Sequence, residues 1–260
     1  LLAVFAQDEF SPREGLFLTA GVRNDDFDTF GRATTGRLTA AWLAPGRRWK
    51  LRASHGTAFR SPSFLDLYGR SAFYTGNPAL RPERAAGWDA GVDLQVAKEG
   101  TISATWHETR LRDLIASTAN FRSVENIQRA RTRGLEVSGR VAAAASEVRW
   151  SYGYLEADNL TTDRRLLRRP RHRGSVDLWR DFTGGFGAGV GLAVTAQRED
   201  VDARTFRTID GEDFAVVRVY GEYRVTPRLA LKARLENLLG ERYEEVHGYP
   251  APGFGAFGAL

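Results

Sequence analysis

Aromatic, amide and arginine side chains gather in one polar segment of the chain, residues 60–83. Flat rings can stack on a planar ligand, while amide and guanidinium groups add hydrogen bonds. Prolines and glycines fix the segment into turns. Because turn chemistry also serves loop folding, we expect Phe64 and Tyr68 to close the loop on itself. The candidate ligand-binding residues are three rings, an amide and an arginine: Tyr68, Phe73, Tyr74, Asn77 and Arg81.

A second group of side chains could bind a cation through oxygen atoms. Asn24 precedes three carboxylates at Asp25, Asp26 and Asp28. Oxygen ligands at such spacing suit calcium, but the glycine and glutamate pattern of a complete calcium loop is missing. Two interpretations follow: a calcium site at these three aspartates, or an acidic turn exposed to solvent.

Residues for catalysis are not found in a recognisable arrangement. The sequence has no cysteine, so thiolate metal sites and cysteine nucleophiles are excluded. The four histidines are far apart and form no metal-binding pair (His55, His107, His172 and His247). The glycines of 187–191 do not form a phosphate-binding loop, because no strand–turn–helix pattern surrounds them. We therefore expect no catalytic residue, no cofactor and no catalytic metal.

The elements that must position these groups show a period of two residues. In residues 88–96, Trp88, Val92 and Leu94 alternate with polar partners such as Asp89 and Asp93. Such alternation is typical of strands with one apolar and one polar face. It recurs along the chain, with charges and glycines on one face, as a polar barrel lumen requires. An ordinary antiparallel sheet with one wet face is the alternative. No apolar run reaches the ~18–20 residues of a transmembrane helix.

The connections between the predicted strands alternate between short and long. Short turns fall at residues 11–15, 45–48, 98–100, 144–147, 183–185 and 226–228. Long loops fall at residues 24–35, 61–86, 118–131, 158–171, 199–212 and 244–250. This layout predicts an all-β fold, a transmembrane antiparallel up-and-down β-barrel with about thirteen strands in this chain. Because that number is odd and the barrel must close, we expect earlier strands upstream.

The distribution of positive charge indicates which binding partners are to be expected. The sequence carries 37 Lys and Arg against 32 Asp and Glu, and its one basic cluster is at 164–173. Nucleic-acid binding usually requires such a cluster on a compact fold, whereas here it lies in a predicted outer loop. We expect no nucleic acid as partner. Outer-leaflet phosphates, an anionic ligand or solvent alone remain possible partners.

Three stretches carry a family resemblance. RSPSFLDLYG at 60–69, GNPALRPE at 76–83 and ENLLGERYEEVHGYPAPG at 236–253 resemble the TonB-dependent outer-membrane receptors. The resemblance implies a 22-stranded plugged barrel. Residues 1–260 would form the C-terminal portion of the barrel domain, with the plug and the earlier strands absent from this chain. The ending at 243–253 is most similar to the cobalamin-transporter branch, although a siderophore or haem receptor could carry it too.

The function that this resemblance implies is active uptake of a scarce, large nutrient at the outer membrane of a Gram-negative bacterium. The ligand would be cobalamin-like, or a ferric siderophore or haem. The partners would be outer-membrane lipid and lipopolysaccharide, the ligand, and the TonB energy-coupling complex acting through the missing N-terminal part. The protein would not be an enzyme. Two alternatives stay open, a passive porin and an outer-membrane barrel enzyme. An upstream plug would favour the receptor, and a barrel closing at fourteen or sixteen strands would favour the porin.

Overall fold

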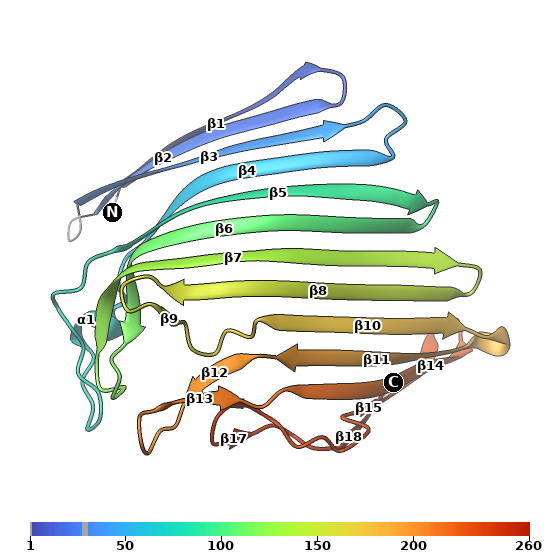
Figure 1. Cartoon of the computed structure of the whole chain (residues 1–260). Coiled ribbons are helices and arrows are strands. Elements are labelled where there is room, and N and C mark those ends of the chain that lie inside the picture. Colours follow the sequence, from blue (N-terminus) through green and yellow to red (C-terminus); the bar gives the residue numbers. More distant parts are fainter. Residues whose placement is uncertain (1, 28–30) are drawn as a thin grey trace. The chain divides into compact units, whose positions relative to one another are not determined.

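Long antiparallel strands dominate the computed structural model, which describes residues 2–27 and 31–260 (Figure 1). The main strands are β1 (Leu2–Arg13), β2 (Leu16–Phe27), β3 (Gly31–Leu43), β4 (Trp49–Arg60), β5 (Glu83–Ala97), β6 (Gly100–Ser117), β7 (Val124–Ala143), β8 (Ser146–Asn159), β10 (His172–Asp181), β11 (Phe186–Ala196), β14 (Phe214–Thr226), β15 (Leu229–Glu236) and β18 (Gly255–Ala259). The short elements are α1 (Phe64–Tyr68), η1 (Thr183–Gly185), β9 (Arg164–Arg165), β12 (Arg198–Val201), β13 (Thr208–Gly211), β16 (Glu244–Val246) and β17 (Tyr249–Pro250).

The sheet topology is that of an up-and-down fold. In the described part of the chain, thirteen strands follow one another in a 14-stranded sheet, in the order β1 to β8, β10, β11, β14, β15, β18, and β9 pairs with β8 off this path. Each main strand is thus hydrogen-bonded to its neighbours along the sequence. The prediction of an all-β antiparallel fold with about thirteen strands is confirmed.

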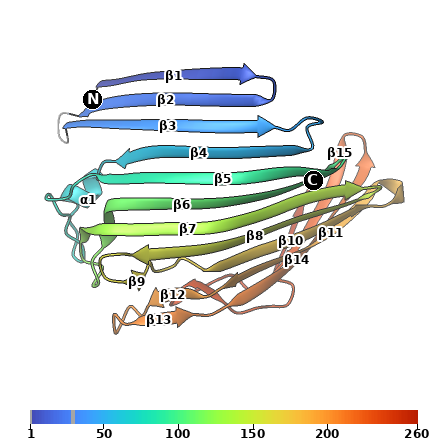
Figure 2. The same ribbon diagram turned by 45° about the horizontal axis from the view of Figure 1, so that its top comes forward.

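Two compact units make up the chain. The first contains residues 1–92, 105–134 and 156–166, and the second contains residues 93–104, 135–155 and 167–260. In the first unit, β1 to β4 form consecutive hairpins (Figure 2). In the second unit, β10, β11, β14, β15 and β18 pair in that order. Among the described residues, no helix is long and apolar enough to span a membrane.

The alternation of side chains along the strands has the predicted polarity. Val176 of β10 lies opposite Leu192 of β11, and the two side chains are 48% and 40% exposed. Asp177, the next residue of β10, lies opposite Gly191. Since neighbouring strand residues point to opposite faces, one face of this sheet is apolar and exposed and the other polar. That distribution is typical of a β-barrel whose outer face meets lipid.

The six predicted short turns are all observed between strands, but strands extend into two of the predicted long loops. Residues 24–35 were expected to form an outer loop, whereas β2 continues to Phe27 and β3 begins at Gly31. The strands continue because their polar residues satisfy one another: the Asn24 side chain donates to Thr34 at 2.8 Å, and Arg32 pairs with Asp26 at 3.1 Å. Similarly, β7 begins at Val124, within the predicted loop 118–131.

Two of the long connections contain small hairpins of their own. β12 pairs with β13, and β16 pairs with β17. The connection after β15 is fixed by Asn237, which is 3% exposed and has a positive φ of 49°. Its side chain accepts from the Glu241 amide at 2.8 Å and donates to the Glu241 carbonyl at 2.8 Å. The ENLLGERY stretch is therefore a closed turn built around one asparagine.

Candidate functional site

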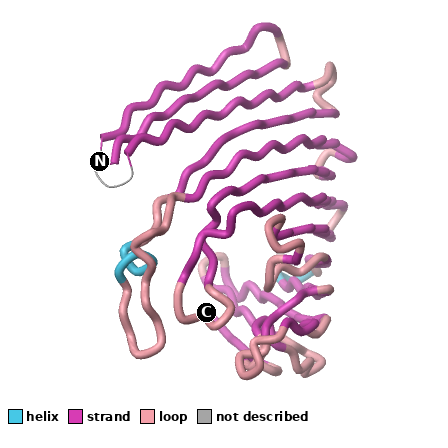
Figure 3. Tube along the Cα trace, turned by 60° about the vertical axis from the view of Figure 1, so that its left-hand side comes forward, coloured by secondary structure: helices cyan, strands magenta, loops and turns pink. Residues whose placement is uncertain are grey.

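The connection between β4 and β5 is an ordered loop built on a single helical turn, α1 (Figure 3). Ser63 caps α1: its hydroxyl accepts from the Asp66 amide at 3.1 Å, and Asp66 accepts from the Ser63 amide at 2.9 Å. This reciprocal pair satisfies backbone donors that the first turn would otherwise leave free. The capping box explains why a five-residue helix forms here.

A small apolar core holds the loop together. Leu67, Leu80 and Val124 are buried against one another, and Tyr74 packs on them. The Tyr74 hydroxyl donates to the Leu65 carbonyl at 3.4 Å. Burial, together with the nearby Asp66 carboxylate, raises the pKa of Tyr74. Tyr74 is therefore part of the loop's own packing and does not offer a free ring.

Two glycines permit the close packing of this loop. A Cβ at Gly69 would lie 2.5 Å from the Leu65 carbonyl oxygen, and a Cβ at Gly76 would lie 2.7 Å from the Leu67 carbonyl carbon. Both neighbouring atoms belong to the backbone and cannot move aside cheaply. The glycines are required where the end of α1 and the returning chain meet.

Asn77 and Arg81 fasten the loop to neighbouring elements of the first unit. The Asn77 side chain donates to the Val124 carbonyl at 3.1 Å and accepts from the Ala79 amide at 3.0 Å. Arg81 forms an ion pair with Asp113 at 2.6 Å, although its own side chain is 67% exposed. Asn77 is thus mainly structural, while Arg81 still faces solvent.

The outer surface of this loop is apolar. Phe64, Tyr68 and Phe73 are 85%, 60% and 78% exposed, and Leu65 beside them is 66% exposed. The expectation that Phe64 and Tyr68 close the loop is wrong. Within the single turn of α1, only Leu67 reaches the apolar core, which leaves the other large side chains of the turn outside. We call Phe64, Leu65, Tyr68 and Phe73 the loop apolar surface.

The acidic group in β2 is engaged with arginines. Asp25 accepts two hydrogen bonds from Arg23 Nε and a third from Nη2 at 2.7 Å. Asp26 pairs with Arg32. Asp25 and Asp26 are consecutive strand residues and so lie on opposite faces. In the described part of the chain no three acidic or histidine side chains converge on a possible metal position. Asp28, the third candidate, lies outside the described residues.

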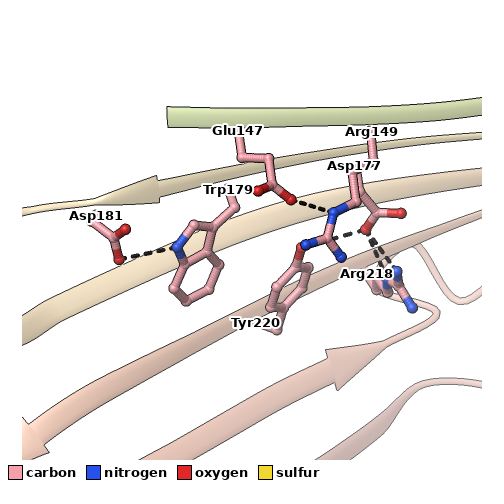
Figure 4. Close-up of a pocket in the computed structure, with 7 residues that line it drawn as sticks. All are labelled: Glu147, Arg149, Asp177, Trp179, Asp181, Arg218 and Tyr220. Carbon is pink, nitrogen blue, oxygen red and sulfur yellow. Dashed lines mark hydrogen bonds and ion pairs between the residues drawn. The ribbon is translucent and has the colours of Figure 1, made fainter. Parts of the chain in front are cut away.

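A hollow of about 390 Å³ lies on the polar face of the second unit, at the short-turn end of β8 and β10. Figure 4 shows the seven side chains that line it, from β8, β10 and β14. Asp177 pairs with Arg218 at 2.6 Å, and Trp179 donates to Asp181 at 3.0 Å. The rings of Trp179 and Tyr220 stack with centroids 5.5 Å apart.

The glycines of β11 make this arrangement possible. β11 lies between β10 and β14, yet side chains of those two strands meet across it. A Cβ at Gly189 would lie 2.6 Å from the Tyr220 ring, and a Cβ at Gly191 would lie 2.6 Å from an Asp177 carboxylate oxygen. The sequence alone predicts glycines on one strand face but does not show which residues cover them. An aromatic residue at a polar-face position of each flanking strand, Trp179 and Tyr220, is the sequence feature that could have indicated this cover.

The basic cluster at 164–173 is partly neutralised within the second unit. Arg168 Nε lies 2.8 Å from a carboxylate oxygen of Asp200, whose side chain is 1% exposed. Two histidines have polar partners. His172 Nδ1 forms a hydrogen bond of 2.8 Å with the Tyr152 hydroxyl, and His247 Nδ1 lies 3.4 Å from a carboxylate oxygen of Glu244. None of these arrangements resembles a nucleophile with its base.

Comparison with solved structures identifies the same fold in known receptors. The chain is similar to the copper transporter OprC, with 20% identity, a TM-score of 0.79 and coverage of 97% of this chain and 46% of that one. It is similar to the ferric enterobactin receptor PfeA of Pseudomonas aeruginosa, with 19% identity, a TM-score of 0.81 and coverage of 98% and 44%. It is also similar to the siderophore receptor PirA of Acinetobacter baumannii, with 14% identity, a TM-score of 0.83 and coverage of 98% and 44%.

These likenesses establish the fold, and the chain spans less than half the length of the structures it matches. Those proteins are named as receptors and transporters, not as enzymes. A family model described as "TonB dependent receptor-like, beta-barrel" matches residues 1–238. Because that match covers most of the 260 residues, the chain belongs to the TonB-dependent receptor family and is part of its β-barrel.

Proposed function

We propose that this chain is the C-terminal portion of the barrel of an outer-membrane receptor that takes up a large metal chelate with energy supplied through TonB. Residues 1–260 would follow a plug and earlier strands in the full protein. The family match and the relatives, which are more than twice as long, support this organisation. The ligand class is a cobalamin-like molecule, a ferric siderophore or haem. The membrane would be the outer membrane of a Gram-negative bacterium.

The loop apolar surface is the observation that carries the proposal. Three rings and a leucine are presented to solvent on a loop with its own core and a capped helix. An ordered loop that exposes large rings loses little conformational freedom on binding, which favours capture of a partly apolar ligand. Stacking of one ring contributes about 0.5–1.5 kcal/mol beyond the area that it buries. Arg81 pairs with Asp113 but is 67% exposed, and its remaining N–H groups could donate to a carbonyl or carboxylate oxygen of the ligand.

Of the five candidate ligand-binding residues, we therefore retain Tyr68, Phe73 and Arg81 in direct contact with the ligand. Tyr74 and Asn77 act as supports, because their side chains are engaged inside the loop. Leu65 and Phe64 join the contact surface. The calcium interpretation of Asp25 and Asp26 is not retained, since arginines already pair with both carboxylates.

A binding experiment on the purified full-length protein tests this function. Ferric enterobactin and cyanocobalamin serve as probes, and affinity is measured by quenching of intrinsic fluorescence. The double substitution Tyr68→Ala with Phe73→Ala should weaken binding of the recognised chelate at least tenfold, about 1.4 kcal/mol. Phe206→Ala is the matched control, because Phe206 is 49% exposed on the turn between β12 and β13. Unchanged affinity in the double variant, or an equal loss in the control, would contradict the assignment.

A further inference from the structure

An outer cavity lies in the second unit, well separated in sequence from the loop apolar surface. Its volume is about 700 Å³, and it is lined by residues of the β12–β13 and β16–β17 hairpins and the segments around them. Both hairpins belong to long connections, which follow β11 and β15, and so lie on the side opposite to the short turns. The volume is sufficient for a small organic molecule.

A buried arginine forms one wall of this cavity. Arg198 is only 6% exposed, and its Nη2 donates to the carbonyl oxygen of Glu244. Its guanidinium carbon lies 5.9 Å from the centre of the Phe214 ring. Its Nε is buried without a hydrogen-bond partner, and within residues 2–27 and 31–260 no carboxylate forms an ion pair with this guanidinium.

A buried guanidinium without a carboxylate partner is costly, because arginine remains charged in proteins and little of the buried charge is solvated. Asp200, a buried acid that lines the same cavity, forms no ion pair with Arg198, since its carboxylate is paired with Arg168 and accepts two backbone N–H groups. Nε itself lies too deep for a ligand, because it packs against Gly211. The cavity wall nevertheless carries a positive charge that no carboxylate of the described residues pairs with. A carboxylate from outside that reaches the part of Arg198 lining the cavity would balance this charge.

The lining also contains acidic and aromatic side chains. Asp210 and Glu212 are exposed at the edge of the cavity. Tyr243 also lines the cavity, and its ring stacks on Phe214 with centroids 4.1 Å apart. A simple anion would be repelled by the two edge carboxylates, and a simple cation would leave Arg198 unpaired. A molecule that carries both charges avoids both penalties.

We propose that this cavity binds a small zwitterion of the amino-acid type, whose carboxylate pairs with Arg198 and whose ammonium group faces Asp210 and Glu212. An apolar or aromatic body of the ligand would lie against Tyr243. This site is independent of the proposed chelate site. It would let the outer loops recognise a free amino acid or an amino-acid group within a larger ligand.

Three matched probes test the proposal on the intact protein in detergent: phenylalanine, 3-phenylpropionate, which lacks the ammonium group, and phenethylamine, which lacks the carboxylate. Binding is measured by isothermal titration calorimetry. Phenylalanine should bind at least tenfold more tightly than either fragment. Arg198→Gln should weaken phenylalanine and 3-phenylpropionate at least tenfold and leave phenethylamine unchanged. Arg204→Gln is the control, because Arg204 is exposed on the β12–β13 turn and does not line the cavity.

A second variant keeps the test valid if Arg198→Gln disturbs the fold. Asp210→Asn with Glu212→Gln changes only exposed edge residues and should weaken phenylalanine and phenethylamine but not 3-phenylpropionate. The proposal is overturned if phenylalanine does not bind, if phenethylamine binds as tightly as phenylalanine, or if the Arg204→Gln control loses as much affinity as Arg198→Gln.

Discussion

Gly189 shows how the absence of one side chain positions several others. It lies in β11, at a point where Tyr220 from β14 leans across to stack on Trp179 from β10. The backbone carbonyl oxygen of Leu178 is also within 2.8 Å of the position that a Cβ would take. Tyr220 could not keep this position beside a larger residue. Glycine is therefore needed at this strand position because it leaves room for neighbouring side chains, and not because of a turn conformation.

A substitution at Gly189 tests this role. Gly189→Ala should destabilise the protein by about 1–3 kcal/mol, because overpacking forces a ring or the backbone to shift. The measurement is the free energy of unfolding in lipid vesicles, with near-ultraviolet circular dichroism to follow the Trp179–Tyr220 stack. Gly153→Ala is the matched control, since its Cβ would meet only one atom, the Arg173 carbonyl oxygen at 3.9 Å. Equal stability of the two variants would contradict the role given to Gly189.

At the scale of elements, Asp200 joins separate outer connections of the second unit. Its carboxylate accepts from Arg168 at 2.8 Å, from the Val201 amide at 2.7 Å and from the His247 amide at 2.7 Å. Burial alone would raise the pKa of Asp200, but these hydrogen bonds and the Arg168 charge hold the pKa below its usual value. The β12–β13 hairpin, the β16–β17 hairpin and the segment before β10 are thereby fastened at one carboxylate.

The lowered pKa of Asp200 predicts a pH dependence of loop order. A depressed pKa in the folded state gives stability above the unfolded value, about 3.9, and that stability is lost as the pH falls through the folded-state pKa. At pH 7 the carboxylate is therefore charged and the contacts are intact. Hydrogen exchange, corrected for intrinsic rates, should show strong protection of the His247 amide at pH 7 and loss of it in acid.

Asp200→Asn separates the charge from the shape of this side chain. The amide oxygen can still accept from backbone N–H groups, but it cannot balance the charge of Arg168. Protection of the His247 amide should fall at pH 7 and become nearly independent of pH. If the variant keeps the protection of the unmodified protein at pH 7, the charged contact is not what fastens the hairpins.

The sequence predicted the strands better than the loops, for a physical reason. A period of two residues is a local property, so Val92 and Asp93 could be assigned to opposite faces without a structure. The environment of Tyr74 depends instead on Leu67, Leu80 and Val124, which come together only in the folded loop. Thus Tyr74 was predicted as a ligand contact, while Phe64 and Tyr68, expected inside, are exposed. The pairing of Asn24 with Thr34 likewise depends on a strand register that the sequence does not state.

At the scale of the whole molecule, the apolar and polar faces of the strands distinguish lipid from lumen. Val176→Arg should cost about 2–4 kcal/mol if the residue meets lipid near mid-membrane. Ser175→Arg, the neighbouring change on the polar face, should cost only about 1 kcal/mol through loss of the Ser151–Ser175 hydrogen bond. The free energy of unfolding in lipid vesicles measures both, and similar costs would show that the two faces are not in different environments.

Membership of the TonB-dependent receptor family is shown for the barrel, and active uptake is the central claim that builds on it. The most direct measurement is accumulation of ⁵⁵Fe-enterobactin and ⁵⁷Co-cyanocobalamin by Gram-negative cells that lack their own receptors and express the full-length protein. We predict that one of these chelates accumulates, that accumulation stops when TonB is deleted, and that Tyr68→Ala with Phe73→Ala reduces it. Accumulation that continues without TonB would contradict active uptake and indicate a passive porin, and accumulation of neither chelate would exclude these two molecules as its ligands.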